Sequence, residues 1–282
     1  MKLLQGGIDM TIHEFAKEII LEAGQNIKDN LSRELIIETK SNPNDLVTNM
    51  DKETEQLLVD RIKRTYPDHV IIGEEGHGKD VNSLEGVIWI IDPIDGTLNF
   101  VHQQQNFAIS IGILKDGKKY AGLVYDVMND RLFHAVAGEG AYLNEVHLNN
   151  VHDTVIETSI ISMNPNWLTK EWIKEVYSPI IADARSARSY GSAALDFVYV
   201  ASGIVDCYMT LRLHPWDFMG GQIIAEETGA VVTNQLGEAL DPLKSNSILV
   251  ANPKLHHDIL NGYLKTYEKQ LREIHQGMFT SR

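Results

Sequence analysis

The sequence predicts a layered α/β fold, with a mixed and largely antiparallel sheet in the N-terminal half and a smaller α/β layer in the C-terminal half. Three observations predict it. Two short apolar runs, at residues 69–72 and 87–91, are each followed within a few residues by acids. Extended segments then follow over residues 107–136, with a hairpin connection at residues 115–118. In the second half, the apolar spacing alternates between that of strands and that of helices.

The first elements can be justified one by one. Apolar residues recur at helical spacing from Ile12 to Ile27, and Thr11 with Glu14 forms a capping-box pattern, so a long first helix is expected. Residues 35–37 suit a short strand, residues 40–45 a loop and residues 51–66 a second helix. Because no periodicity begins before Ile12, Met10 and Met1 both remain candidate starting residues of the natural chain.

The later elements follow from the same spacing rules. Strands are predicted at residues 69–72, 87–91, 107–114, 120–126, 131–136, 158–162, 185–190, 205–210, 230–233 and 247–251. Helices are predicted at residues 170–182, 193–203, 216–229 and 254–274. The polar stretch at residues 149–154 suggests a boundary, which gives an N-terminal half of residues 1–150 and a C-terminal half of residues 151–282.

Composition limits the class of protein. The 282 residues carry 25 Lys and Arg against 39 Asp and Glu, a net charge of −14, and 43% are hydrophobic. These values are ordinary for a soluble globular protein and argue against a broad basic surface for nucleic acid. The single cysteine, Cys207, excludes an intramolecular disulfide and favours a cytoplasmic location. No apolar run approaches the roughly 20 residues of a membrane span, and the start lacks the features of a signal peptide.

The most informative segment runs from Asp92 to Thr97. Asp92 follows an apolar strand and Asp95 comes three residues later, so a tight turn would aim both carboxylates at one spot. Two such carboxylates repel each other unless a cation lies between them, and their hard oxygens suit Mg²⁺. Gly96 permits a bend, and a helix beginning at Thr97 would present free N–H groups to an anion. The alternative is an Asp-Pro turn with a helix cap.

Other acids occupy comparable positions. Glu74 and Glu75 follow the strand at residues 69–72, just as Asp92 follows the next strand. Asp217 stands where a helix would begin, and Asp51 stands at the start of the second helix, so helix capping is the alternative role of both. Each signal is weak alone, but together they suggest that strand ends and helix starts converge on one acidic site.

Four segments also have the order and spacing of a known family. They are Asp45-Leu46-Val47-Thr48 with Asp51, Gly73-Glu74-Glu75, the run from Trp89 to His102, and Pro215-Trp216-Asp217. Over about residues 12–262 the chain resembles the inositol monophosphatase family. The resemblance implies an alternating αβαβα sandwich of the sugar-phosphatase type and hydrolysis of a phosphate monoester with two or three Mg²⁺ ions. It also implies frequent inhibition by Li⁺ and, in many members, a homodimer.

The resemblance assigns roles to particular residues. It implies that Glu74, Asp92 and the Ile94 carbonyl hold one Mg²⁺, that Asp92, Asp95 and Asp217 hold a second, and that Glu74 also reaches a third, weaker ion. Thr97 and Asp51 are the expected pair that orients and deprotonates the attacking water, and the N–H groups of Gly96 and Thr97 are expected to hold phosphate oxygens. No phosphoenzyme is expected, so Cys207 has no nucleophilic role.

Substrate-side residues are less defined. Lys40 matches a basic position in a flexible loop of the family, with a solvated surface lysine as the alternative. The turn Gly191-Ser192-Ala193 matches a small-residue turn beside the substrate alcohol, with helix capping by Ser192 as the alternative. Thr210 stands seven residues before Asp217, where inositol-binding members carry an acid, and a hydroxyl accepts more weakly than a carboxylate.

That departure leaves the preferred substrate open. Arg185, Arg188 and Arg212 are candidates for a second anionic group, as in NADP or fructose 1,6-bisphosphate, and surface or ion-paired arginines are the alternative. The leading hypothesis is therefore an inositol monophosphatase-type enzyme acting on a small phosphorylated substrate, with a broader phosphatase for NADP or fructose 1,6-bisphosphate as the second. A regulatory protein that binds other proteins is the hypothesis of a different class. Neither nucleic acid nor membrane is an expected partner.

Overall fold

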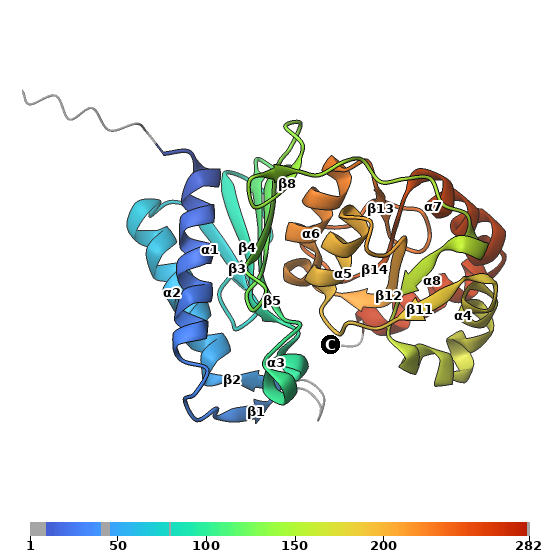
Figure 1. The fold of residues 1–282 in the computed structure, drawn as a ribbon, viewed down its shortest axis with the longest axis horizontal. Coiled ribbons are helices and arrows are strands. Elements are labelled where there is room, and N and C mark those ends of the chain that lie inside the picture. The colour runs from blue at the N-terminus through green and yellow to red at the C-terminus, as the bar shows by residue number, and fades with distance from the viewer. Residues whose placement is uncertain (1–9, 41–45, 79, 281–282) are drawn as a thin grey trace, which may run out of the picture.

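The computed structural model describes residues 10–40, 46–78 and 80–280, and its elements stack in the order helices, sheet, helices, sheet, helices (Figure 1). This is the αβαβα sandwich that the family resemblance implied. The predicted loop at residues 40–45 and the question of the start before Met10 fall almost entirely outside the described residues.

The first sheet has seven strands in simple sequence order. Its strands are β3 (Val70–Gly73), β4 (Val87–Asp95), β5 (Ala108–Lys115), β6 (Lys118–Asp126), β7 (Arg131–Val136), β8 (Ala141–Leu143) and β9 (Val146–His147). Strands β3 and β4 run parallel, whereas the pairs from β4 to β9 are antiparallel. The parallel pair makes β3 and β4 end at the same edge of the sheet, so the residues that follow them lie close together.

Two helices, α1 (Ile12–Asp29) and α2 (Asn49–Thr65), cover the outer face of this sheet (Figure 1). The apolar stripe of α1 buries Phe15, Ile19 and Ile27 in the core that α1 and α2 share with the sheet. The predicted capping box is present, because Glu14 N–H donates to Thr11 Oγ1 (3.1 Å) and Thr11 N–H donates to the Glu14 carboxylate (2.8 Å).

The second sheet has five strands in the order β11-β10-β12-β14-β13. Their bounds are β10 (Ile160–Ser162), β11 (Ser186–Arg188), β12 (Cys207–Leu213), β13 (Val231–Thr233) and β14 (Asn246–Ala251). Strands β11, β10 and β12 are parallel, and β14 joins β12 and β13 antiparallel. Its outer face is covered by α4 (Glu171–Asp183), α7 (Pro253–Ile259) and α8 (Glu268–Thr280) (Figure 1).

Between the sheets lie α5 (Ala193–Ala201) and α6 (Pro215–Glu227) (Figure 1). Glycines let α6 rest directly on the first sheet. A Cβ at Gly220 would lie 2.9 Å from the Leu123 carbonyl oxygen, and one at Gly122 would lie 2.3 Å from the Gly220 carbonyl oxygen. The core between the sheets draws residues from both of them, so α6 is fixed relative to β4. This close packing determines where the first turn of α6 meets the end of β4.

The structure corrects several predicted bounds. The predicted single helix over residues 254–274 is interrupted, because a π turn (Leu260–Leu264) and a 3₁₀ turn (Lys265–Tyr267) separate α7 from α8. The short strands β8 and β9 were not predicted. Neither was β2 (Leu46–Thr48), which pairs antiparallel with β1 (Ile37–Thr39), and the apolar residues 35–37 mostly precede β1.

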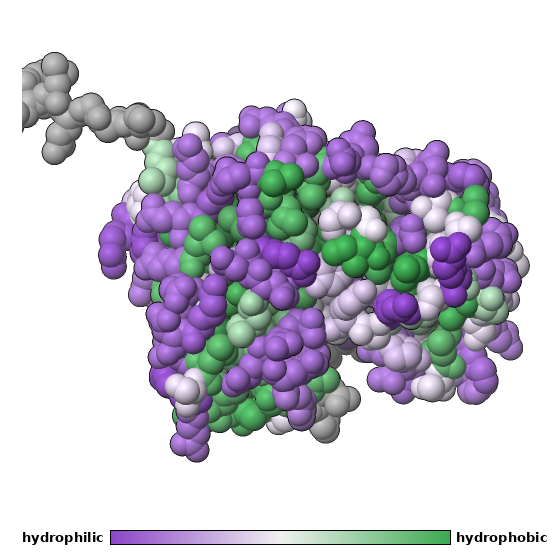
Figure 2. Space-filling view, in the orientation of Figure 1, coloured by the Kyte–Doolittle hydropathy of each residue, from purple (hydrophilic) through white to green (hydrophobic). Residues whose placement is uncertain are grey.

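The two sheets lie on either side of residue 150. However, α5 and α6 of the second half pack against strands of the first, so the division at residue 150 stays a prediction about domain organisation. None of the helices in the described ranges is both long and apolar enough to cross a membrane. The face seen in Figure 2 is mostly polar, with apolar residues in small scattered groups.

Candidate metal centre

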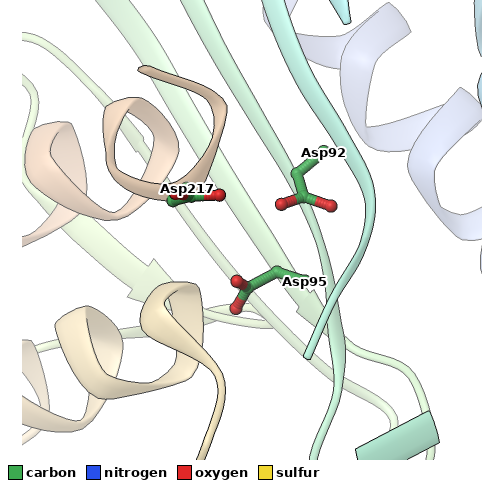
Figure 3. Close-up of side chains that lie close together, drawn as sticks. All are labelled: Asp92, Asp95 and Asp217. Carbon is green, nitrogen blue, oxygen red and sulfur yellow. The ribbon is translucent and has the colours of Figure 1, made fainter. Parts of the chain in front are cut away.

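Three aspartates converge between the sheets, two from the end of β4 and one from the first turn of α6 (Figure 3). One ligand oxygen from each of Asp92, Asp95 and Asp217 lies within 4.8 Å of the others. Oxygens on opposite sides of one Mg²⁺ are about 4.2 Å apart, twice the usual bond length. The three carboxylates are therefore close enough to share divalent cations.

A bulge in β4 explains why both of its aspartates face the same way. Residues three apart in a regular strand point to opposite faces. Here Asp92 pairs with Ser110 and Asp95 pairs with Ala108. Between these two pairs β4 advances by three residues while β5 advances by two, so β4 contains one extra residue. The extra residue turns Asp95 toward the same side as Asp92, and the Ile94 N–H donates to Asp92 Oδ1 (3.0 Å) within the bulge.

Helix starts hold the other two carboxylates. Asp95 Oδ2 accepts hydrogen bonds from the Ser192 hydroxyl and from the Ala194 N–H (2.8 Å) at the beginning of α5. Asp217 Oδ2 accepts from the His214 N–H (2.7 Å), which makes Asp217 part of a capping box for α6. Each carboxylate can thus bind a helix start with one oxygen and still point its second oxygen toward the other aspartates. The capping role is therefore compatible with a shared site.

Burial and mutual repulsion make the anionic state of this cluster costly. Asp92 is 2% exposed and Asp95 is 7% exposed. Burial, together with the charges of Glu74 and Asp95, raises the pKa of Asp92 well above its usual range, and burial with the charge of Asp95 does the same for Asp217. Burial raises the pKa of Asp95 to about 6. Within the described residues no ion pair neutralises these three aspartates, so the donor set fits a hard divalent cation such as Mg²⁺.

Glu74 stands at the edge of the cluster, directly after β3. Burial raises the pKa of Glu74 to about 7, although Lys40 opposes the effect. Lys40 Nζ contacts Glu74 Oε1 at 3.0 Å and Glu75 Oε1 at 2.8 Å. Although burial opposes the charged ammonium, these two carboxylates raise the pKa of Lys40. Lys40 therefore lies beside the acidic site in this structure.

Thr97 and Asp51 lie next to the bulge. The Thr97 hydroxyl is 3.1 Å from Asp51 Oδ1 and 3.1 Å from the Ile94 carbonyl oxygen, so its single proton points toward these two acceptors. Thr48 donates to Asp51 Oδ2 through its N–H (2.8 Å) and its hydroxyl (2.5 Å), as part of the capping box of α2. Burial raises the pKa of Asp51, against these hydrogen bonds.

The turns at Gly96 and Gly191 pack against each other. Gly96 has a φ of 94° and caps the helix α3 (Thr97–Gln103), and a Cβ there would lie 3.2 Å from the Gly191 carbonyl oxygen. Asn99, whose role the sequence did not reveal, donates to the Tyr190 carbonyl oxygen (2.6 Å) and the Asn106 carbonyl oxygen (2.8 Å). Its place in the motif two residues after Thr97 was the only available signal.

The residues predicted to bind the substrate do not all lie beside the aspartate cluster. Gly191, Ser192 and Ala193 lie at the start of α5, beside Asp95. Arg188 lies on the edge strand β11, is exposed, and donates to the Ser186 hydroxyl and the Ala187 carbonyl oxygen rather than to the acids. Thr210 is buried in β12, at 6% exposed.

Cys207 is buried in β12, and burial raises the pKa of its thiol, so it is not poised as a nucleophile.

Comparisons with known proteins agree with this geometry. A sequence model described as "Inositol monophosphatase family" matches residues 9–269. The inositol-1-monophosphatase of Bacillus subtilis strain 168 is 51% identical over 255 residues, which cover 90% of this chain and 96% of that protein. The Nus factor SuhB of Vibrio cholerae is 39% identical over 240 residues, covering 83% of this chain and 88% of that protein.

Solved structures show the same fold. Inositol monophosphatase-II from Staphylococcus aureus superimposes with a TM-score of 0.88 at 52% identity, covering 94% of this chain and 97% of that one. Structures of SaIMPase-II have been determined with inositol monophosphate (TM-score 0.87, 50% identity, 94% and 97% covered) and with 2′AMP (0.88, 51%, 93% and 98%). An IMPase/NADP phosphatase complexed with NADP and Ca²⁺ is 28% identical, with a TM-score of 0.82 over 89% of this chain and 96% of that one.

Proposed function

The chain belongs to the inositol monophosphatase family, and from that premise we propose that it hydrolyses phosphate monoesters with Mg²⁺ as its cofactor. The observation that carries the proposal is the convergence of Asp92, Asp95 and Asp217 within 4.8 Å, with Asp92 and Asp95 buried and Asp217 partly exposed. Buried carboxylates this close need a cation to be stable as anions, and a phosphate monoester is a ligand that such cations hold.

We assign the ligands as follows. One Mg²⁺ would be held by Glu74, Asp92 and the Ile94 carbonyl. A second would be held by Asp92, Asp95 and Asp217, and Glu74 would also reach a third. Mg²⁺ bound there neutralises the phosphate and lowers the pKa of a water. The raised pKa values of Asp92, Asp95 and Asp217 support this assignment, because each carboxyl would give up its proton when a cation takes the place of that proton.

Asp51 and Thr97 act on the attacking water. The Thr97 proton points toward Asp51 Oδ1 and the Ile94 carbonyl, which leaves the lone pairs of the Thr97 hydroxyl free to accept a hydrogen bond from the water. As the water loses a proton to Thr97, the Thr97 hydroxyl passes its own proton to Asp51. Burial supports Asp51 in this role because it raises the pKa of the Asp51 carboxyl.

Different segments bind the phosphate and the alcohol of the substrate. The N–H groups of Gly96 and Thr97, at the start of α3, hold phosphate oxygens. The turn Gly191-Ser192-Ala193 lines the alcohol side, and its support is the contact between Ser192 and Asp95, which attaches the turn to the metal centre. Positioning and electrostatic stabilisation then supply most of the rate enhancement, and no phosphoenzyme forms.

Thr210 supports a broader substrate range than inositol 1-phosphate alone. A hydroxyl at this position discriminates weakly among alcohols, because it lacks the charge with which a carboxylate binds ring hydroxyls. The binding of both inositol monophosphate and 2′AMP by a relative about 50% identical favours the same breadth here. NADP and fructose 1,6-bisphosphate are the further candidates, with Arg188 reaching their second anionic group after leaving its contacts on β11.

The test is release of inorganic phosphate by the purified chain. Inositol 1-phosphate, 2′-AMP, NADP and fructose 1,6-bisphosphate are each incubated with Mg²⁺ or with EDTA. We expect Mg²⁺-dependent release from at least the first two compounds, and none with EDTA. Release that persists in EDTA, or that Asp217→Asn leaves unchanged at saturating Mg²⁺, would refute the metal assignment.

A regulatory role is the alternative, because relatives 34–39% identical are Nus factors. A purely regulatory chain would have no use for the metal-dependent release, so the same assay separates the two classes. We further propose that the chain forms a homodimer, which the family resemblance supports. We also propose that it is located in the cytoplasm, which the single cysteine supports. Light scattering would show twice the mass of one chain if the dimer forms.

A further inference from the structure

The turn that carries Glu74 rests on a buried glutamate of α2, Glu55. We propose that Glu55 is a positioning residue that fixes Glu74 in the geometry required to bind Mg²⁺. This inference rests on the proposed function, since it gives a purpose to Glu55 only if Glu74 is a metal ligand. Glu55 itself touches neither Asp92 nor Asp95 through any contact in the described residues.

Glu55 holds the turn through two hydrogen bonds. Its side chain is 1% exposed, and its carboxylate oxygens are divided between two donors. Oε2 accepts from the Glu75 N–H (2.8 Å), and Oε1 accepts from Nδ1 of His77 (2.6 Å). The two donors belong to residues one and three positions after Glu74. The Glu55 carboxylate therefore fixes the backbone that follows Glu74.

The backbone before Glu74 packs closely against the same carboxylate. A Cβ at Gly73 would lie 2.4 Å from Glu55 Oε2, so only glycine leaves room for the carboxylate at this point. The turn is closed by the Gly73 N–H, which donates to the His77 carbonyl oxygen (3.0 Å), and the Glu74 N–H donates to the Ile91 carbonyl oxygen on β4 (3.2 Å). Glu74 is thus held on both sides, with Glu55 in the centre of the turn.

One helix therefore places two parts of the site. Asp51 and Glu55 are four residues apart on α2, so they project from the same face. Asp51 reaches Thr97, and Glu55 reaches the turn of Glu74. A fixed turn matters because Lys40 also attracts the Glu74 carboxylate, with its Nζ 3.0 Å from Glu74 Oε1. Without Glu55, the turn would be held less firmly against the attraction of Lys40.

Titration calorimetry with Mg²⁺ tests the inference directly, with steady-state kinetics as a second readout. The variants are Glu55→Ala, Glu55→Gln, His77→Ala and His77→Asn. Glu55→Gln retains one acceptor oxygen, and His77→Asn retains an N–H donor close to the position of Nδ1. Gln56→Ala is the matched control. Gln56 is the exposed neighbour of Glu55 on α2, and within the part of the chain that the structure describes its side chain bonds to Asp60 alone.

We expect Glu55→Ala to weaken Mg²⁺ binding by about 10–100-fold, as loss of a residue that orients a metal ligand typically does. The Mg²⁺ affinities of Glu55→Gln and His77→Ala should lie between those of Glu55→Ala and the natural chain. His77→Asn should recover most of the affinity that His77→Ala loses. The Mg²⁺ concentration for half-maximal rate should rise in parallel, with kcat at saturating Mg²⁺ changed less than about threefold. If Glu55→Ala does not fold, the other three variants carry the test.

The outcomes separate the two proposals. If the natural chain does not bind Mg²⁺, the proposed function fails. If it binds Mg²⁺ and Glu74→Gln weakens the binding, but the foldable Glu55 and His77 variants bind as tightly as Gln56→Ala, only the positioning role is refuted. A fall in kcat with unchanged Mg²⁺ affinity would also refute it, because that pattern indicates a general loss of folded protein.

Discussion

The aspartate cluster should make the metal-free protein less stable than it would be without the cluster, and Asp95→Asn exposes this cost. Asp95 is 7% exposed, and burial raises its pKa from 3.8 to about 6. The substitution removes the buried charge with little change in shape. Because the Ser192 hydroxyl and the Ala194 N–H both donate to the single oxygen Oδ2, the amide oxygen of asparagine can accept both hydrogen bonds.

The magnitude follows from the pKa difference. At 1.36 kcal/mol for each pKa unit, a rise of about 2 corresponds to about 3 kcal/mol between the protonated and ionised forms. An acid whose pKa is raised on folding stabilises the fold fully below its unfolded pKa, and this contribution is lost as pH rises through the folded pKa. The free energy of unfolding of Asp95→Asn, relative to the natural chain, should therefore increase between pH 4 and pH 7 by up to about 3 kcal/mol.

Urea unfolding in EDTA, at intervals from pH 4 to pH 8, measures this difference. Asp60→Asn, an exposed change on α2, is the control and should give a flat difference. At saturating Mg²⁺ the order should reverse, because the natural chain gains more stability from binding than Asp95→Asn, which lacks a ligand of the second Mg²⁺. Parallel stability profiles for the natural chain and Asp95→Asn across this pH range would refute the reasoning. So would a maximum in the difference below pH 4.

Further predictions concern catalysis, specificity and packing. Thr97→Ala should lower kcat by about 10²–10⁴-fold while Thr97→Ser stays within tenfold, and equal losses in both would contradict the hydroxyl's role. Thr210→Glu should raise kcat/KM for inositol 1-phosphate relative to 2′-AMP by about tenfold, since hydrogen bonds to charged groups contribute about 1.5 kcal/mol or more. An unchanged ratio would mean that the alcohol of the substrate does not contact residue 210. Gly122→Ala should lower the free energy of unfolding by about 1–3 kcal/mol, because the added methyl would lie 2.3 Å from the Gly220 carbonyl oxygen. Gly262→Ala is the control and should not lower it, because a methyl there would have no neighbouring atom within 4 Å. Li⁺ should inhibit phosphate release in a concentration-dependent way, as the Li⁺-soaked inhibitory complex of a relative suggests, and full activity at 100 mM Li⁺ would contradict this prediction.

Local chemistry made much of the fold predictable. The capping box of Thr11 and Glu14 fixed the start of α1, and the apolar runs at residues 69–72 and 87–91 located β3 and β4, because buried strands in a covered sheet carry few polar residues. Short edge strands such as β9 were missed, since two residues leave no period to detect. The break between α7 and α8 was missed because the apolar spacing continues through the π turn.

The site was only partly predictable, for a different reason. Asp92 and Asp95 could be paired because both lie on one strand end, and the family motif linked them to Asp217 across more than 100 residues. No residue pattern indicated that a bulge turns Asp95 toward Asp92, or that Glu55 contacts the turn of Glu74. Such contacts depend on how α2 crosses β3, and neither periodicity nor spacing along the chain encodes that crossing.

The central claim is that Asp92, Asp95 and Asp217 hold divalent cations. Anomalous diffraction from crystals grown with Mn²⁺, collected near the manganese absorption edge, tests it most directly. We predict at least one anomalous peak within bonding distance of oxygens from all three aspartates, and none there in Asp95→Asn. Crystals in saturating Mn²⁺ that show no peak between these carboxylates would contradict the account.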